Sequence, residues 1–342
     1  MRYSVVLHLS QEILFFSMKI GVIGTGMMGR QLAIRLAKSG HEVMVFNRHK
    51  SKVQVIYQST DGNKIRMANT PADVGNDSKI VIVCVKDHQA IIDISVAKGD
   101  AGLIESSRSA RGNKDFIVIQ CSTISPTESN HVANLYADRN IKLITVPIIG
   151  GITAAERGEL VLIAAGSKKS FNVAKPLLKD ISKQLFYVGP NHSTASTLKL
   201  AININIALIA LALAEGLVFV KGTGIDPDIF LKILNSTYFK TGLSENKGPK
   251  IIHDEYTASF SLTNMVKDLK LTLQTAYNLG LILPVTASAH AIYKASEAVD
   301  LSNLDYTSVA SFLLRLNGIS RFEKRRRQSK DSVHPGNTKN RC

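Results

Sequence analysis

The sequence predicts an α/β protein in which a doubly wound parallel sheet is followed by an all-helical domain. Three observations support this fold class. Short apolar strands alternate with helical patterns up to about Gly189, strand signals largely cease beyond it, and a long apolar helix follows. With 342 residues and 45% hydrophobic content, the chain is long enough for two ordinary domains.

A strand, a glycine-rich turn and a helix open the first domain. Lys19–Ile23 is rich in strand-forming residues, GTGMMG follows at Gly24–Gly29, and Gln31–Lys38 has a helical pattern that ends at Gly40. His41–Phe46 is predicted to be the second strand. A G-x-G-x-x-G sequence in this context is the fingerprint of a Rossmann dinucleotide-binding turn.

Each glycine of this turn has its own predicted role. Gly24 permits the tight turn, Gly26 lets the backbone approach a pyrophosphate, and Gly29 lets the helix pack on the strand. Unpaired N–H groups at the helix N-terminus then face the phosphates. The residues between the glycines are expected to bind the cofactor as well: Thr25, Met27 and Met28. The alternative is a glycine turn in an α/β protein without a cofactor.

The end of the second strand predicts which cofactor binds. An NAD site usually places an acid there against the ribose hydroxyls, whereas this chain has Asn47 and Arg48. A carboxylate would repel a 2′-phosphate, and an arginine would hold it with two charge-assisted hydrogen bonds. The sequence therefore predicts NADP(H), with NADPH preferred over NADH.

Five further strands are expected before Gly189, with helices between most of them: Lys79–Val85, Phe116–Cys121, Ile141–Val146, Leu160–Ala165 and Gln184–Val188. Ser125-Pro126-Thr127-Glu128 fits a helix-opening capping box with proline at the first helical position.

A long helix, Ser193–Lys221, is expected to form the seam between the two domains. It is apolar on nearly all sides, so something must surround it. Lys199 and Asn203 lie four residues apart and share one helix face, which we expect to look into the interdomain cleft. A membrane span is the rival interpretation, since Ala201–Val220 is long enough; two Asn, one Glu and the absence of a second span argue against it. Taken alone, Lys199 could also be a snorkelling lysine.

Four domain-level segments are predicted. Residues 1–17 form an optional extension before Met18, 18–189 the Rossmann domain, 190–318 the helical domain, and 319–342 a disordered basic tail. The helical domain also contains a helix opened by Asp226-Pro227 and three more, Asn264–Leu279, Val285–Ala298 and Leu304–Leu316.

Charge and cysteine content bound the possible partners. The net charge is +15, of which the tail supplies +6 from eight Lys/Arg against two Asp/Glu. Such a tail could touch nucleic acid or an anionic membrane by charge alone, but a solvated end without a partner is the simpler interpretation. Cys84, Cys121 and Cys342 have no metal or redox spacing, which fits a reducing cytosol and a cytoplasmic protein.

Five motifs, in order, give the chain its resemblance to the β-hydroxyacid dehydrogenase family. They are GVIGTGMMGR, then CSTISP at Cys121–Pro126, PIIGGITAAERGEL at Pro147–Leu160, STLKLAIN at Ser196–Asn203 and MVKDLKLTL at Met265–Leu273. The resemblance implies an oxidoreductase that transfers hydride between NADP(H) and a small hydroxy acid or aldehyde acid. It also implies a homodimer or tetramer.

The resemblance assigns roles residue by residue. The family's catalytic lysine falls on Lys199 and its partnering asparagine on Asn203. The cofactor positions outside the glycine loop fall on Val85, Lys86, Thr123 and Lys267. The substrate positions fall on Ser122, Gly150 and Gly151. No metal site is implied.

Several departures from the family leave other functions open. Ile149 stands where the family usually has serine, which would put a branched apolar side chain in the substrate pocket. Gln120 replaces a frequent Asp, and Thr145-Val146-Pro147 replaces acid-Ala-Pro. Ile202 argues against 6-phosphogluconate dehydrogenase, which would want His there. A non-catalytic NADP(H)-binding regulatory protein and an imine reductase-like enzyme remain alternatives.

Overall fold

The computed structural model describes residues 17–49, 64–99, 101–106 and 116–319, together with Ser51 and Ile56. Its contacts divide the chain into two compact units. The first comprises the chain through Ile209 together with Ala258–Tyr306, and the second comprises Ala210–Thr257 and the residues from Thr307 onward. The predicted boundary at residues 189–190 stays a prediction. The predicted extension and basic tail lie outside the described residues, except for Ser17 and Ile319.

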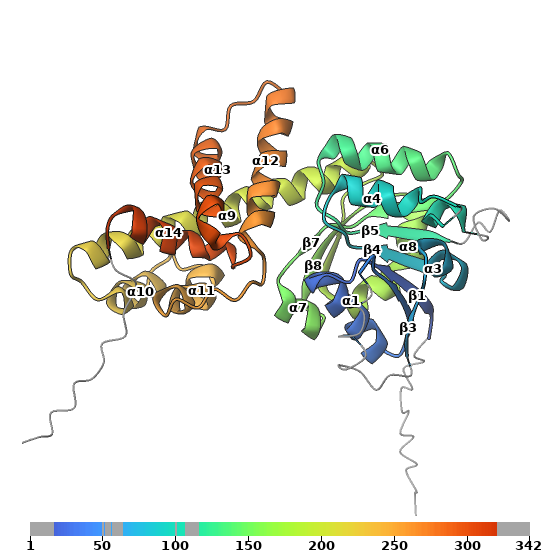
Figure 1. Cartoon of the computed structure of the whole chain (residues 1–342), viewed down its shortest axis with the longest axis horizontal. Coiled ribbons are helices and arrows are strands. Elements are labelled where there is room, and N and C mark those ends of the chain that lie inside the picture. The colour runs from blue at the N-terminus through green and yellow to red at the C-terminus, as the bar shows by residue number, and fades with distance from the viewer. Residues whose placement is uncertain are drawn as a thin grey trace, which may run out of the picture. The chain divides into compact units, whose positions relative to one another are not determined.

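The first unit is built on a mixed sheet. The described residues form nine strands: β1 (Lys19–Ile23), β2 (Glu42–Phe46), β3 (Ile65–Met67), β4 (Ile80–Val83), β5 (Ile117–Gln120), β6 (Lys142–Thr145), β7 (Ile148–Ile149), β8 (Leu160–Gly166) and β9 (Ser182–Tyr187). Their order is β3-β2-β1-β4-β5-β6-β8-β7, and β9 pairs with β8. The predicted doubly wound fold is confirmed (Figure 1).

One part of the strand prediction is wrong: the sheet is not parallel throughout. The strands from β3 to β6 run parallel, but β8 runs antiparallel to both β6 and β7. Both β6 and β7 pair with β8 in one continuous antiparallel register, so β6, Val146-Pro147 and β7 form a single interrupted strand along β8. The strands β3 and β7, three and two residues long, were not predicted because such short segments have no readable period.

Helices cover both faces of the sheet because its central strands are apolar on both sides. In β4, Ile80 and Ile82 enter one hydrophobic cluster, and Val81 and Val83 enter another. The first cluster contains residues of α1 (Met27–Lys38), α7 (Ile152–Arg157) and α8 (Lys168–Asp180). The second contains residues of α3 (Pro71–Asp77), α4 (His88–Ser95) and α6 (Pro126–Ala137), which Figure 1 shows along the opposite face from α1.

The predicted capping box is present at the start of α6. The Glu128 backbone N–H donates to the Ser125 hydroxyl at 3.2 Å, and the Ser125 N–H donates to the Glu128 carboxylate at 2.8 Å. Two donors that a helix end leaves free are thereby satisfied. The signal was readable because all of its residues are adjacent in sequence.

Beyond β9 the described chain is helical, as expected. The helices are α9 (His192–Gly222), α10 (Pro227–Asn235), α11 (Gly242–Ile252), α12 (Leu262–Asn278), α13 (Pro284–Ser296) and α14 (Val309–Leu316). Single turns occur in this region at η2 (Glu297–Leu301) and η3 (Tyr306–Ser308), and a further one, η1 (Leu103–Glu105), lies before β5. The helix α11 was not predicted, because two glycines and Pro249 weaken its pattern.

Two of these elements are strongly apolar: the long helix α9 and the connecting end of α12 and α13. By length and composition α9 could cross a membrane, yet a buried core helix passes the same test, and 44% of its most apolar window is buried.

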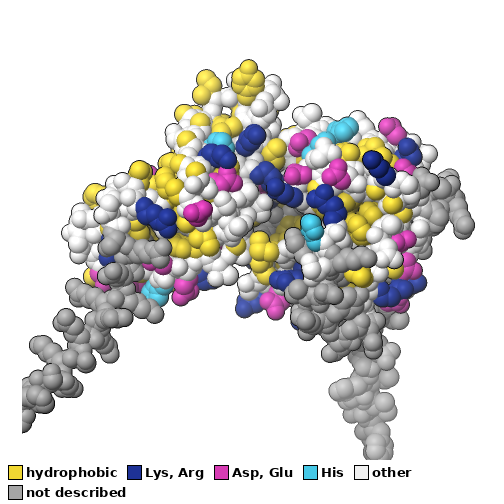
Figure 2. All heavy atoms as spheres, viewed as in Figure 1, with side chains coloured by type: hydrophobic (Ala, Val, Ile, Leu, Met, Phe, Trp, Pro, Cys, Tyr) yellow, Lys and Arg dark blue, Asp and Glu magenta, His cyan; other side chains and the backbone are white. Residues whose placement is uncertain are grey.

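The helices α12 and α13 form a hairpin in the first unit. Large apolar side chains are exposed at its connecting end (Figure 2): Tyr277, Leu279, Leu281, Ile282 and Val285.

Candidate active site

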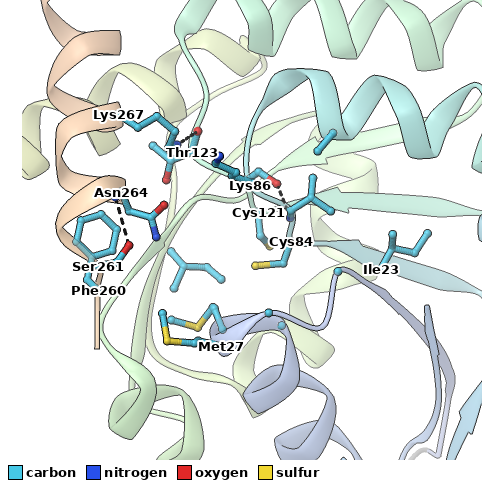
Figure 3. Close-up of a pocket in the computed structure, with 18 of the residues that line it drawn as sticks. Ile23, Met27, Cys84, Lys86, Cys121, Thr123, Phe260, Ser261, Asn264 and Lys267 are labelled. Carbon is cyan, nitrogen blue, oxygen red and sulfur yellow. Dashed lines mark hydrogen bonds between the residues drawn. The ribbon is translucent and has the colours of Figure 1, made fainter. Parts of the chain in front are cut away.

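A cavity of about 670 Å³ lies at the carboxyl ends of β1, β4 and β5. The chain crosses from β1 to β2 on one side, and β4 pairs with β1 on the other, so the strand order reverses here. Parallel α/β sheets bind ligands at such a switch point. Further wall comes from Lys199 and from residues that lead into and begin α12, all within the first unit. Figure 3 shows Phe260 and Ser261 before α12, and Asn264 and Lys267 on it.

The glycine loop has the geometry that a dinucleotide needs. Gly24 has φ +94°, and a Cβ there would lie 2.3 Å from the Cys84 carbonyl oxygen. A Cβ on Gly29 would lie 1.9 Å from the Gly24 oxygen, so α1 can approach the strand only with glycine at this position. A Cβ on Gly26 would meet nothing within 4 Å. That open side, at the N-terminus of α1, fits a pyrophosphate group.

Asn47 and Arg48 follow β2 and line the cavity beside the glycine loop. The Asn47 amide donates to the Thr25 hydroxyl at 2.9 Å and accepts from the His49 N–H at 2.9 Å, which fixes the turn after β2. Arg48 is exposed, and its guanidinium lies 3.5 Å from the Asp93 carboxylate. An exposed pair at this distance contributes little, so Arg48 can exchange Asp93 for a phosphate.

The ends of β4 and β5 are tied together beside the loop. The Val85 backbone N–H donates to the Ser122 hydroxyl at 2.9 Å, and the Gln120 amide donates to the Ser122 carbonyl at 2.9 Å. Ser122 therefore lies buried and fixed at the cavity wall, while Lys86 is exposed at its rim.

A buried acid, Asp268, organises the polar groups opposite the sheet. The Asn203 amide donates to its Oδ2 at 2.6 Å, and the Lys267 ammonium lies 2.8 Å from its Oδ1. Lys267 also donates to the Thr123 carbonyl at 2.7 Å (Figure 3). One carboxylate thus positions Asn203 on α9 and Lys267 on α12, and Lys267 links α12 to the segment after β5.

Lys199 lies at this network and is almost fully buried, with 7% of its surface exposed. Burial lowers the pKa of its ammonium from 10.5 to about 8; Asp268 raises that pKa and Lys267 lowers it further. Lys199 makes no hydrogen bond with the described residues, so its nitrogen is free to bond a ligand in the cavity. A lysine whose pKa is near neutrality can both release and accept a proton.

Most of the residues predicted for the site line this one cavity: Gly24, Gly26, Met27, Met28, Gly29, Asn47, Arg48, Val85, Lys86, Ser122, Thr123, Gly150, Lys199 and Lys267. Three predicted residues are not among its described lining: Thr25, Gly151 and Asn203. Thr25 is buried and bonded to Asn47, and the buried Asn203 donates to Asp268. Gly151 lies against Ser259, whose Cβ would be 3.4 Å from a Cβ at that position.

The expectation that Ile149 enters the substrate pocket is not met. Its side chain packs against Ile163, Ala165 and Ala195, while its neighbours Ile148 and Gly150 line the cavity. Side chains alternate along a strand, and in β7 this alternation turns Ile149 away from the cavity.

The segment before α12 was missed by sequence reasoning. Ser259, Phe260 and Ser261 line the cavity, and the Asp305 carboxylate accepts from the Ser259 N–H and hydroxyl at 2.9 Å each. A signal was present: Ser261 is an N-cap that accepts from the Asn264 N–H, so α12 begins two residues before its predicted start.

Two protein families match successive parts of this chain. A family described as the NAD-binding domain of 6-phosphogluconate dehydrogenase matches residues 19–189, and one described as the NAD-binding domain of NADP-dependent 3-hydroxyisobutyrate dehydrogenase matches residues 193–313. The chain belongs to the β-hydroxyacid dehydrogenase family. This membership confirms the predicted family and the enzyme class, an NAD(P)-dependent oxidoreductase.

Individual relatives agree with this membership. A chloroplastic glyoxylate/succinic semialdehyde reductase of Arabidopsis thaliana is 27% identical over 297 residues, 87% of this chain and 80% of that protein. The cytokine-like nuclear factor N-PAC of Gallus gallus is 26% identical over 291 residues, 85% of this chain but 50% of that protein. A 3-hydroxyisobutyrate dehydrogenase of Salmonella typhimurium has the same fold, with a TM-score of 0.76 at 20% identity over 86% of this chain and all of that one.

Proposed function

We propose that this β-hydroxyacid dehydrogenase interconverts a small hydroxy acid and its aldehyde acid with NADP(H), and that Lys199 is its general acid and base. The observation that carries the proposal is a buried lysine, with a pKa near 8, in the same cavity as the glycine loop. The semialdehyde reductase relative supports the substrate class.

Different residues of the chain bind the cofactor, transfer the proton and attract the substrate. The glycine loop and the N-terminus of α1 would hold the pyrophosphate, and the family resemblance assigns Thr123, which lines the same cavity, to the nicotinamide end of the cofactor. When bound, the nicotinamide supplies or accepts hydride. Lys199 gives its proton to the substrate oxygen in reduction and takes it back in oxidation. Asp268 stabilises the ammonium form of Lys199, and the lysine pair favours an anionic substrate.

Replacing Lys199 tests the assignment. Lys199→Ala is expected to lower turnover of an aldehyde-acid panel at least about 100-fold, the lower end of what a positioned acid or base contributes. NADPH affinity measured by calorimetry should hardly change, because the glycine loop and Arg48 lie on other elements. If the variant kept more than about a tenth of wild-type turnover with chemistry rate-limiting, Lys267 would become the candidate.

The cofactor preference is a second proposal, supported by Arg48 at the cavity. NADPH is expected to bind at least about tenfold more tightly than NADH, which corresponds to about 1.4 kcal/mol. Arg48→Ala should remove the difference by weakening NADPH alone. The matched variant Asp93→Asn frees Arg48 and should leave NADH binding unchanged while NADPH binds as well or better. Equal affinities of the wild type for both cofactors would refute the preference.

Two alternatives predict different results in the same assays. The first alternative is a regulatory protein, which is suggested by the similarity to the nuclear factor N-PAC. Such a protein would bind NADPH without turning over any aldehyde acid. An imine reductase-like enzyme would reduce cyclic imines and tolerate Lys199→Ala. The buried Lys199 and its Asp268 neighbour favour the dehydrogenase over both.

We further infer a cytoplasmic homodimer or tetramer, with no membrane association and with nucleic acid not a partner. The exposed apolar end of the α12–α13 hairpin supports self-association, since monomers rarely expose such clusters. Light scattering on the purified protein, with Ile282→Glu as the disrupting variant, tests the oligomer.

A further inference from the structure

Two cysteines lie side by side at the floor of the cofactor cavity. Cys84 follows β4 directly and Cys121 follows β5, and the register of these parallel strands ends with Val83 opposite Gln120. One residue further on, Cys84 stands opposite Cys121. Neighbouring strands are about 4.8 Å apart, inside the range of roughly 4.4–6.8 Å between Cα atoms that a disulfide needs.

Their side chains share one face and one environment. Both residues line the cavity, and Cys84 packs against the hydrophobic cluster that contains Cys121. Charge on Cys84 also raises the pKa of Cys121, as expected for thiols on paired strand ends. Figure 3 shows both cysteines at the same wall, below Lys86. Both are free thiols in the structure.

We propose that Cys84 and Cys121 form a dithiol site that a small disulfide oxidises to an intramolecular disulfide, and that this modification and NADP(H) binding exclude each other. The thiolate of Cys84, the less buried of the two, attacks the reagent and releases one thiolate. Cys121 then attacks the Cys84 sulfur and releases the second. Two thiols lose two electrons and two protons, and the reagent is reduced to two thiols.

The exclusion follows from the position of Cys84 under the glycine loop. Its carbonyl oxygen lies where it would touch a Cβ on Gly24, and the Gly29 backbone N–H contacts its sulfur. Turning this sulfur towards Cys121 removes it from Gly29 and shifts the strand end on which the loop lies. In the other direction, a dinucleotide that fills the cavity covers both thiols.

Burial makes the pair selective in its reactivity. It raises the pKa of Cys84 to about 11 and that of Cys121 above the ordinary thiol value, so each thiol alone reacts slowly near pH 8. Once the mixed disulfide at Cys84 has formed, the neighbouring Cys121 thiol attacks it. The slow first step is therefore followed by formation of the Cys84–Cys121 disulfide.

The experiment uses the full chain with Cys342→Ser, which removes the third thiol. The cofactor-free protein is treated with 5,5′-dithiobis(2-nitrobenzoate) and analysed by mass spectrometry. We expect two equivalents of thionitrobenzoate per chain, a mass loss of two hydrogens, and a linked pair of peptides that contain Cys84 and Cys121. Saturating NADP⁺ should slow the reaction at least about tenfold. The oxidised protein should bind NADPH at least about tenfold more weakly in calorimetry, with recovery on reduction by dithiothreitol.

Single replacements are the matched controls. Cys84→Ser and Cys121→Ala, each in the Cys342→Ser chain, should release at most one equivalent and keep a thionitrobenzoate adduct instead of closing. Circular dichroism confirms that each variant is folded, and one folded variant is sufficient. Two retained adducts, no reaction, or equal rates with and without NADP⁺ would each overturn the proposal. These readouts do not depend on turnover, so their failure leaves the dehydrogenase assignment untouched.

Discussion

Lys199→Met should stabilise the protein while it abolishes proton transfer. The structure buries a charged ammonium that makes no hydrogen bond with the described residues, and burial lowers its pKa from 10.5 to about 8. At about 1.4 kcal/mol per pKa unit, carrying that charge costs the folded state about 3 kcal/mol. Methionine has a similar shape and no charge to bury, so it removes this cost.

The sign of the effect depends on pH. Below pH 8 both the folded and the unfolded chain carry the Lys199 proton, and the full cost is present. Between pH 8 and 10.5 the folded state loses the proton first, so the cost declines; above 10.5 neither state carries it. The stability difference between Lys199→Met and wild type should therefore fall from about 3 kcal/mol at pH 7 to near zero by about pH 11.

Urea unfolding of the cofactor-free protein, followed by circular dichroism because the chain has no Trp, measures this difference at each pH. Lys175→Met, at an exposed position on α8, is the control and should show no comparable change with pH. A difference that stays constant from pH 7 to 11, or grows with pH, would refute the reasoning that Lys199 carries a desolvated charge.

Four further substitutions test the cavity and the residues packed around it. Gly29→Ala places a Cβ 1.9 Å from the Gly24 oxygen and should lower both stability and NADPH affinity, whereas Gly26→Ala, with open space at its Cβ, should lower NADPH affinity alone; melting and calorimetry separate the two. Asp305→Ala removes the acceptor of two 2.9 Å bonds from Ser259 and should reduce the free energy of unfolding by at least about 2 kcal/mol, measured in urea. Ile149→Ser should cost roughly 1–3 kcal/mol of stability and leave the ranking of aldehyde-acid substrates unchanged, because its side chain packs away from the cavity; a reordered ranking would contradict this.

The parts of the fold that the sequence predicted are those encoded by adjacent residues. The glycine loop, the capping box at Ser125 and the long apolar run of α9 each combine signals within a few turns of chain, and each formed as expected. The direction of β8 was not predictable in this way, because strand direction depends on which partner the strand meets in space.

The site residues, too, were predictable only where a local pattern encodes them. Lys199 and Asn203 were found through their helical spacing and family motif, but Asp268, which joins Asn203 to Lys267, was not assigned a role. Its role depends on burial and on a partner, Asn203, that lies 65 residues away in sequence, and neither is visible in a local pattern. Ile149 was misplaced for a related reason: the alternation of a two-residue strand is fixed by its pairing with β8.

The hydrogen bond from Lys267 to the Thr123 carbonyl joins residues 144 positions apart. During synthesis on a ribosome, the sheet and glycine loop through β9 can therefore form well before the residues that complete the cavity exist. A nascent chain that has passed residue 190 has a place for the dinucleotide but no Asp268, no Lys267 and no Ser259 wall. Such contacts between distant residues form late and slowly. At that stage the chain holds the residues of the glycine loop but not those of the opposite wall, so the cavity can be completed only after Asp268 has been synthesised.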